Sequence, residues 1–325
     1  MKQTDDRNLA LELIRVTEAA AMAAARFQGK GDKEAIDQAA VDAMRGVLSS
    51  IDIDGVVIIG EGEKDDAPML FNGEQVGNGR GPAMDVAVDP VDGTRPTAEG
   101  GQGALAVISM APQGSMYAPG RLVYMDKIAV GEEAAGAIEI DAPVKHNLRQ
   151  VAKARGKSVE NVTAIMLDRP RNEPMVRQVR EAGGRIRLIK DGDISGAIST
   201  CVDSGIDILL GIGGSPEAVT SACALIALGG EMQCRLWPRD ESERDYAKEA
   251  GLDLDAVLTH RDLVDSDNTF FAATGVTSGE LLRGVRYEAG RAETHSVVMR
   301  SMTGTIRFIE AQHRFDRMKP IGPIF

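Results

Sequence analysis

Five carboxylates stand where they could bind metal ions together. Four follow short apolar runs and one lies in a helical segment upstream; in chain order they are Asp37, Glu61, Asp89, Asp92 and Glu217. Carboxylates gathered at the ends of buried strands repel one another and are costly to remove from water. A hard divalent cation with oxygen ligands, Mg²⁺ or Mn²⁺, resolves both costs. The alternative for each acid taken singly is a solvated loop position on an acidic protein.

The hexapeptide DPVDGT weakens that alternative for two of the five acids. Asp89 and Asp92 lie in it beside Pro90, whose ring stiffens the loop. Gly93 permits a close approach of the backbone to a ligand, and Thr94 supplies a hydroxyl. The combination favours a ligand-binding loop over a solvated turn.

Apolar spacing predicts the elements that must position these residues. Two N-terminal helices are predicted over residues 7–28 and 33–50, the second capped by Asp32. Short apolar runs predict strands in the first half of the chain, over residues 55–60, 84–88, 103–110 and 122–130.

Beyond a polar helix predicted over residues 143–160, strands alternate with helices, which indicates α/β crossovers. The elements predicted there are strand 163–167, helix 173–182, strand 185–189, helix 194–203, strand 206–211, a glycine-rich turn and helix 216–228. Late strands are predicted over residues 268–275, 284–288, 294–300 and 304–312. This change from strand-rich sequence to alternating helices and strands predicts a domain boundary near residue 160.

The acidic balance of the 325-residue chain excludes several classes of partner. With 37 Lys and Arg against 49 Asp and Glu, its formal charge is −12, which argues against nucleic-acid and anionic-membrane binding. A bound divalent metal still allows an anionic small substrate. The sequence predicts a cytoplasmic protein. Its three cysteines include no CxxC pair, and it shows no apolar leader and no apolar run of the ~20 residues that a membrane span needs.

Six ordered segments resemble the class II fructose-1,6-bisphosphatases of bacteria, within the lithium-sensitive superfamily that includes the inositol monophosphatases. They are GKGDKEAIDQAAVDAMR, IDGVVIIGEGEKDDAPML, AVDPVDGTR, DRPRNEPMV, IKDGDISGAI and GIGGSPEAV. The resemblance runs from about residue 8 to about residue 312. It implies a layered α/β sugar-phosphatase fold with alternating helical layers and mixed sheets. With the boundary placed near residue 160, an N-terminal α+β half (1–160) would carry most metal ligands. A C-terminal α/β half (161–325) would carry the sugar and phosphate contacts and one metal ligand.

The resemblance implies two sites for Mn²⁺ or Mg²⁺, the first formed by Asp37 and Glu61 and the second by Asp89, Asp92 and Glu217. Many family members carry Glu where Asp92 stands, and Asp at this position matches the inositol monophosphatase form. Two metals about 3.5–4 Å apart can stabilise the attacking and leaving oxygens of a phosphate ester.

Four residues are the predicted catalytic groups. Thr94 would orient the attacking water, and Asp37 or Glu61 would accept its proton. Lys33 lies one helical turn before Asp37, so both could face one site. The alternative for Lys33 is an exposed lysine in the first turn of the helix.

The resemblance also implies a set of substrate contacts, two of which, Asp92 and Thr94, have a second role given above. The set is Asp92, Gly93, Thr94, Tyr124, Arg169, Pro170, Arg171, Asp191, Gly192, Asp193 and Gly214. The cations of Arg169 and Arg171 suit a second phosphate, with a solvated basic turn as the alternative. Asp193 could accept sugar hydroxyls or could only cap a helix. The glycines at 211–214 could turn backbone N–H groups toward an anion, and Tyr124 could simply be a core strand residue.

The function that the resemblance implies is metal-dependent hydrolysis of fructose 1,6-bisphosphate to fructose 6-phosphate and phosphate in gluconeogenesis. A sedoheptulose 1,7-bisphosphatase, or a dual enzyme of the Calvin cycle, is the nearest alternative, because both substrates present the same phosphorylated ketose end. An inositol-type monophosphatase would leave the second phosphate-binding group unused, and a non-catalytic sensor would have no need of Thr94. The family also implies a homo-oligomer, a dimer or a tetramer.

Overall fold

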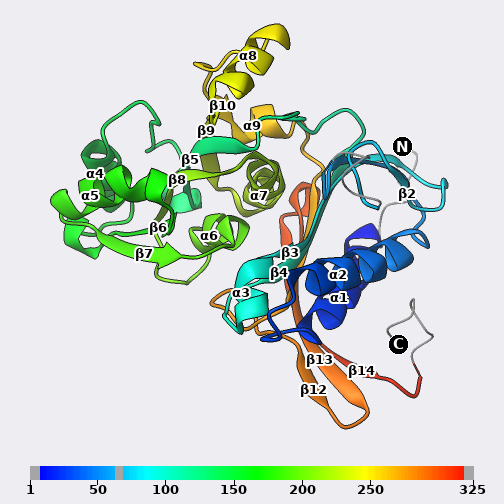
Figure 1. Cartoon of the computed structure of the whole chain (residues 1–325). Coiled ribbons are helices and arrows are strands. Elements are labelled where there is room, and N and C mark those ends of the chain that lie inside the picture. Colours follow the sequence, from blue (N-terminus) through cyan, green and yellow to red (C-terminus); the bar gives the residue numbers. More distant parts are fainter. Residues whose placement is uncertain (1–7, 63–68, 318–325) are drawn as a thin grey trace. The chain divides into compact units, whose positions relative to one another are not determined.

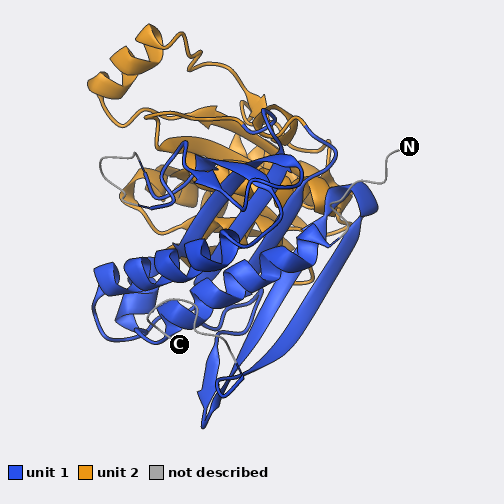
Figure 2. Cartoon of the chain, turned by 90° about the vertical axis from the view of Figure 1, so that its right-hand side faces the viewer, with its two compact units in different colours: residues 1–116, 266–325 blue, residues 117–265 orange. Residues whose placement is uncertain are grey.

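The computed structural model describes residues 8–62 and 69–317. The chain divides into two compact units, unit 1 (Met1–Met116 with Ser266–Phe325) and unit 2 (Tyr117–Asp265) (Figure 2). Their boundaries do not coincide with the one expected near residue 160, which falls inside unit 2. The change of sequence pattern there marks the start of helix–strand alternation within one sheet rather than the edge of a compact unit.

The helices of unit 1 confirm the two N-terminal predictions. They are α1 (Leu9–Ala25), α2 (Lys33–Leu48) and the short α3 (Thr94–Glu99). Asp32 caps α2 as expected, because its Oδ1 accepts a hydrogen bond from the Ala35 N–H at 2.9 Å. The helix α3 was not predicted, since its six residues are too few to show a helical period.

An eight-stranded mixed sheet, counted over the described residues, forms the rest of unit 1. Its strands are β1 (Asp54–Ile59), β2 (Gln75–Val76), β3 (Ala83–Asp92), β4 (Leu105–Pro112), β11 (Phe270–Gly275), β12 (Arg286–Glu288), β13 (Arg291–Arg300) and β14 (Thr305–Arg314). Their order is β12-β13-β11-β4-β3-β1-β2, with β14 paired along β13. β1 and β3 run parallel, and the other neighbours run antiparallel.

One face of this sheet is covered by α1 and α2 (Figure 1). The alanines of α1 allow a close approach to the sheet, and large side chains such as Leu13, Met44, Ile108 and Phe270 are completely buried in between. This packed layer is the rigid support on which Asp37 of α2 and the end of β3 are held.

A buried acid lies at the edge of this core. Glu18 of α1 accepts a hydrogen bond from Thr294 Oγ1 at 3.0 Å, and His313 Nε2 lies 2.8 Å from the same hydroxyl. Burial raises the pKa of Glu18 to about 7, although the Thr294 hydrogen bond and the charge of Arg15 act in the opposite direction. Burial also lowers the pKa of His313.

Glu18→Gln is therefore expected to stabilise the protein more at pH 8 than at pH 5. An acid with a raised folded-state pKa binds more protons folded than unfolded, so its contribution to stability is lost as the pH rises toward 7. The gain in unfolding free energy should be about 2 kcal/mol larger at pH 8, measured by thermal unfolding. Glu12→Gln, an exposed change on the same helix, is the control; an equal gain from Glu18→Gln at both pH values would contradict the account.

Unit 2 is a six-stranded sheet with helices on both faces (Figure 1). The strand order is β10-β9-β5-β8-β6-β7, comprising β5 (Tyr124–Val130), β6 (Thr163–Leu167), β7 (Arg185–Ile189), β8 (Ile208–Gly214), β9 (Glu231–Leu236) and β10 (Leu258–Thr259). β6 runs parallel to β7 and β8, whereas the pairs of β5 with β8, β5 with β9 and β9 with β10 are antiparallel. The predicted α/β crossovers are confirmed on the parallel side.

The helices of unit 2 are α4 (Val144–Ala154), α5 (Glu173–Glu181), α6 (Asp193–Ser199), α7 (Ser215–Leu228), α8 (Glu241–Glu249) and α9 (His260–Leu263). Successive side chains along each strand point to opposite faces of the sheet, so each face packs against its own helices. Ile128 of β5 packs in the core that α4 and α5 close, whereas α6 packs through Gly196 on Leu209 of β8. In the part of the chain that the structure describes, no helix is both long and apolar enough to cross a membrane.

Candidate active site

The DPVDGT motif forms the end of a strand rather than a loop. Strand β3 does not stop at residue 88 as predicted but continues through Asp92. Asp89 pairs with Val107 of β4, and Asp92 pairs with Leu105. Between these two pairs β3 advances by three residues and β4 by only two, so β3 carries a bulge there. Such a bulge admits Pro90, which has no N–H to give to a regular ladder, and it redirects the flanking side chains. The Asp89 Oδ1 fastens the bulge by accepting the Val91 N–H at 3.1 Å.

Gly93 turns the chain from this strand into α3. Its backbone is left-handed, with φ of 109°, and a Cβ there would come within 3.0 Å of the Ala104 Cβ. Any other residue would be strained at this position. The Gly93 carbonyl accepts the N–H and the hydroxyl of Thr97, at 3.0 and 2.9 Å. The turn therefore fixes Thr94 as the first residue of a short helix.

Thr94 and Asp37, two predicted catalytic residues, are in direct contact. The Thr94 hydroxyl lies 2.6 Å from Asp37 Oδ1 and 3.1 Å from the Val91 carbonyl oxygen. It has a single hydrogen, and the carboxylate is the stronger acceptor. A hydroxyl that donates to Asp37 keeps its oxygen lone pairs available for a water molecule.

The two predicted catalytic carboxyl groups of unit 1, Asp37 and Glu61, have raised pKa values. Burial raises the pKa of Asp37, and the Thr94 hydrogen bond and the charge of Lys33 oppose it. The pKa of Glu61 rises to about 7, first because protein atoms exclude water from its carboxyl group and second because Asp37 repels it. Glu61 is nevertheless exposed as a residue, so one side of it meets solvent. Lys33 is exposed and acts on Asp37 through space.

The donor chemistry of unit 1 suits a hard cation. Among the described residues, no three Asp, Glu, His or Cys side chains meet closely enough to hold a metal ion. Asp37 and Glu61 nonetheless offer two mutually repelling oxygen donors, and Asp92 is 6% exposed. Mg²⁺ typically uses one or two carboxylates and keeps several waters. The assignment of metal ligands therefore stays a prediction whose chemistry the residues fit.

In unit 2, Asp193 is held by a lysine that the sequence analysis did not single out. Gly192, with φ of 90°, occupies the cap of α6, so the alternative in which Asp193 only caps the helix is wrong. Asp193 instead accepts from Lys127 Nζ at 2.5 Å, and both side chains are buried. The signal was a charged residue inside the apolar strand of residues 122–130, because a buried charge requires a partner.

The glycines at 211–214 belong to β8 and do not form the predicted turn. Their small size makes room for carboxylates. A Cβ at Gly213 would overlap the Asp193 Oδ2, and one at Gly214 would overlap the Glu217 Oε2. That Glu217 oxygen has no hydrogen-bonding partner among the described residues, and burial, together with Asp193, raises the pKa of Glu217 to about 7. A buried, unpaired carboxylate oxygen is a suitable ligand for a cation.

The two arginines of unit 2 that are predicted to bind phosphate differ in their partners: Arg169 is in an ion pair, whereas Arg171 pairs with no acid that the structure describes. Arg169 forms an ion pair with Asp191, so two predicted substrate contacts lie together. Arg171 donates from Nε to the Ile212 carbonyl at 3.1 Å and lies 4.2 Å above the Tyr124 ring. Neither of its Nη groups has a hydrogen-bonding partner within the described part of the chain.

Trp237, which the sequence did not single out, supports this stack. Its ring lies edge-on to Tyr124, with centroids 6.2 Å apart. Pro170 begins the 3₁₀ turn Pro170–Asn172 that carries Arg171. The guanidinium fork is thus oriented by a ring, a carbonyl and a stiff turn, an arrangement that suits a phosphate.

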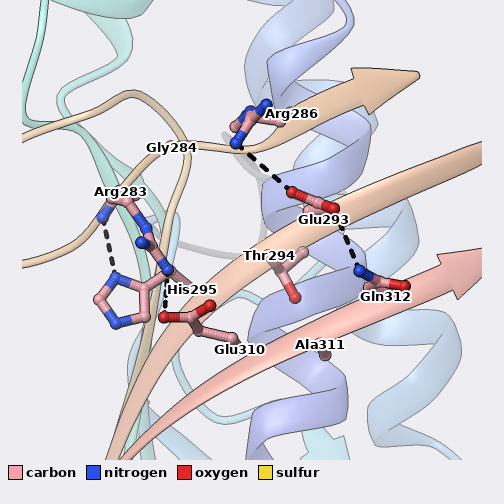
Figure 3. Close-up of a pocket in the computed structure, with 9 residues that line it drawn as sticks. All are labelled: Arg283, Gly284, Arg286, Glu293, Thr294, His295, Glu310, Ala311 and Gln312. Atoms are coloured by element: carbon pink, nitrogen blue, oxygen red, sulfur yellow. Dashed lines mark hydrogen bonds and ion pairs between the residues drawn. The ribbon is translucent and has the colours of Figure 1, made fainter.

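A separate hollow of about 350 Å³ lies in unit 1 over β13 and β14 (Figure 3). Its charged side chains pair with one another, Arg283 with Glu310 and Arg286 with Glu293, and none of the predicted site residues lines it. The hollow is therefore not the candidate site.

A layered α/β chain with acids on a strand bulge and an oriented arginine fork has the features of a phosphatase of small phosphorylated molecules. Over residues 7–313 it matches the family described as "Bacterial fructose-1,6-bisphosphatase, glpX-encoded". It is 43% identical to "Fructose-1,6-bisphosphatase 1 class 2" of Escherichia coli (strain K12) over 329 aligned positions, 97% of each chain. The class 2 enzyme of Shigella flexneri is equally similar. The chain belongs to the bacterial class 2 fructose-1,6-bisphosphatase family, which confirms the resemblance.

Proposed function

We propose that the protein hydrolyses the 1-phosphate ester of fructose 1,6-bisphosphate, giving fructose 6-phosphate and phosphate. Membership of the family supports the reaction. The observation that carries the site is the Thr94 hydroxyl held 2.6 Å from Asp37 Oδ1, at the end of the bulged strand that bears Asp89 and Asp92.

In this proposal Thr94 orients the attacking water. Its hydrogen points to Asp37, so its oxygen accepts a hydrogen bond from water and directs the water's lone pair at phosphorus. The water's proton passes to the Asp37 or Glu61 carboxylate. Lys33 is proposed to assist through its charge.

Mg²⁺ or Mn²⁺ is the proposed cofactor, with Asp37, Glu61, Asp89, Asp92 and Glu217 as its ligands. When bound, such ions lower the pKa of the attacking water and neutralise the charge that develops on the leaving oxygen. The protein residues hold those oxygens in place. The proposed homo-oligomer follows from the resemblance alone, and the proposed cytoplasmic location follows from the cysteine pattern of the sequence.

The second phosphate and the sugar are proposed to meet the residues of unit 2. The open fork of Arg171, stacked on Tyr124, would hold the 6-phosphate in two hydrogen bonds. Asp193 would accept hydrogen bonds from the sugar hydroxyls. The ion pair of Arg169 with Asp191, which carries no net charge, would lie beside them.

Arg171→Ala is expected to raise KM about tenfold to hundredfold, the loss that follows from removing charged hydrogen bonds to a phosphate. Arg169→Ala should raise KM much less, because Asp191 already neutralises that guanidinium. Steady-state kinetics on the two variants makes the comparison, with kcat close to wild type in both. An equal or larger effect of Arg169→Ala would reverse the assignment.

A substrate panel tests the proposal as a whole. Phosphate release is measured with Mg²⁺ or Mn²⁺ from fructose 1,6-bisphosphate, sedoheptulose 1,7-bisphosphate, fructose 1-phosphate and inositol 1-phosphate. The highest kcat/KM is expected for fructose 1,6-bisphosphate. Preference for inositol 1-phosphate, or release from none of the four, would contradict the proposed function.

A further inference from the structure

Lys127 is a lysine buried at the centre of unit 2. It lies in the middle of β5 with only 3% of its surface exposed, opposite Gly211 of β8 on one side and Cys234 of β9 on the other. Burying an ammonium group removes its hydration, so the fold must supply partners or lose stability.

The partners of Lys127 come from two elements that carry predicted site residues. Its Nζ donates to Asp193 Oδ2 at 2.5 Å and to the Gly214 carbonyl at 2.7 Å. Asp193 begins α6, and Gly214 immediately precedes α7, the helix of Glu217. The Gly214 carbonyl fixes the ammonium in place, and the ammonium in turn fixes the Asp193 carboxylate.

The surroundings leave Asp193 little freedom to find another partner. A Cβ on Gly213 would overlap its Oδ2, so the carboxylate rests directly on the backbone of β8. The cavity beside Lys127, Asp193 and Asn172 is about 10 Å³, enough for about one water molecule. Without the ammonium, Asp193 would be a buried carboxylate beside the acid Glu217, and it would rotate toward solvent.

We propose that Lys127 is a positioning residue that orients the Asp193 carboxylate toward the sugar hydroxyls of the substrate. The inference rests on the proposed function, in which Asp193 contacts the substrate. Lys127 itself is too deeply buried to touch a sugar, so it acts on the sugar hydroxyls through Asp193. Two features follow: loss of Lys127 changes KM rather than kcat, and it changes nothing further once Asp193 has lost its charge.

The test compares Lys127→Met, Asp193→Asn and the double variant in steady-state kinetics. Lys127→Met keeps the stem of the side chain and removes the charge. We expect Lys127→Met and Asp193→Asn each to raise KM about tenfold with kcat within about threefold of wild type, the size of one charged hydrogen bond. The double variant should have the KM of Asp193→Asn alone, since coupled residues give non-additive effects.

Lys157→Met is the matched control. Lys157 also pairs with a buried aspartate of unit 2, Asp207, at 2.6 Å, and neither belongs to the candidate site. Its loss should lower Tm but leave KM unchanged. A rise in KM for this variant equal to that of Lys127→Met would show that any broken ion pair has the effect, and would overturn the inference.

Three further results are decisive. If Lys127→Met does not fold, as judged by circular dichroism, the double variant is compared with Asp193→Asn. The double variant removes both charges of the Lys127–Asp193 pair and leaves neither without its partner. A further rise in KM in the double variant overturns the inference. Folded Lys127→Met with the wild-type KM, while Asp193→Asn has a raised one, overturns it as well. Failure of the wild-type protein to hydrolyse fructose 1,6-bisphosphate refutes the proposed function itself and is read independently of the variants.

Discussion

Asp89→Asn should lower kcat about a thousandfold or more, equivalent to ~4 kcal/mol of transition-state stabilisation. The amide keeps an oxygen in the Oδ1 position, so it can still accept the Val91 N–H that fastens the bulge. The variant therefore removes the negative charge of a proposed metal ligand and leaves the local fold intact. Phosphate release at saturating fructose 1,6-bisphosphate and metal measures the loss.

Asp52→Asn is the matched control for this charge change. Asp52 also belongs to unit 1, but it is exposed and pairs with Arg80 at 3.3 Å on the surface. Its kcat should equal that of the wild type. Asp89→Asn with a wild-type Tm and substantial metal-dependent activity would contradict the role given to the DPVDGT motif.

Thr94→Val should lower kcat about a hundredfold, the size of loss expected when the attacking water is no longer held in position. Valine has the shape of threonine but cannot donate to Asp37 or accept a hydrogen bond from water. KM should change little, because the lost contacts are to the attacking water rather than to the bound sugar. Single-turnover kinetics separates this loss from slow product release.

Thr94→Ser is the matching variant that keeps the hydroxyl. It should retain at least a tenth of the wild-type kcat, because serine can make the same 2.6 Å hydrogen bond to Asp37 Oδ1. Equal losses in the serine and valine variants would show that the methyl group, and hence packing, determines the effect. The water-orienting role of Thr94 would then be wrong.

Local signals predicted the regular elements of the fold well. The start of α2 could be read from Asp32 because a capping side chain acts on the residues next to it. Strands β6 and β7 have the predicted bounds, since short apolar runs between polar turns leave few alternatives. The resemblance also identified Thr94 and Asp37, which are far apart in sequence but form a direct hydrogen bond.

Features that depend on partners distant in sequence could not be predicted. The continuation of β3 through Pro90 requires the bulge, which exists only because β4 lies alongside. The glycines at 211–214 have a turn-like composition, yet they form a strand because they pair with β5. Gly213 and Gly214 must lack a side chain there because the carboxylates of Asp193 and Glu217 occupy the space beside them.

Charge pairing was the other hidden feature of the site. Arg169 and Arg171 are equivalent in sequence, but only the structure pairs the first with Asp191 and leaves the Nη groups of the second open within the described residues. Asp193 has the composition of a helix cap, but the lysine that holds it lies 66 positions away on β5. Residue types alone do not reveal which opposite charges meet.

Product analysis of the wild-type protein tests the central claim most directly. Fructose 1,6-bisphosphate is incubated with the protein, and fructose 6-phosphate and inorganic phosphate are quantified in parallel, with added Mg²⁺ or Mn²⁺ and with EDTA. We predict equal amounts of the two products, formed only with metal and not by Asp89→Asn. Formation at the same rate in EDTA, or phosphate without fructose 6-phosphate, would contradict metal-dependent hydrolysis of the 1-phosphate ester.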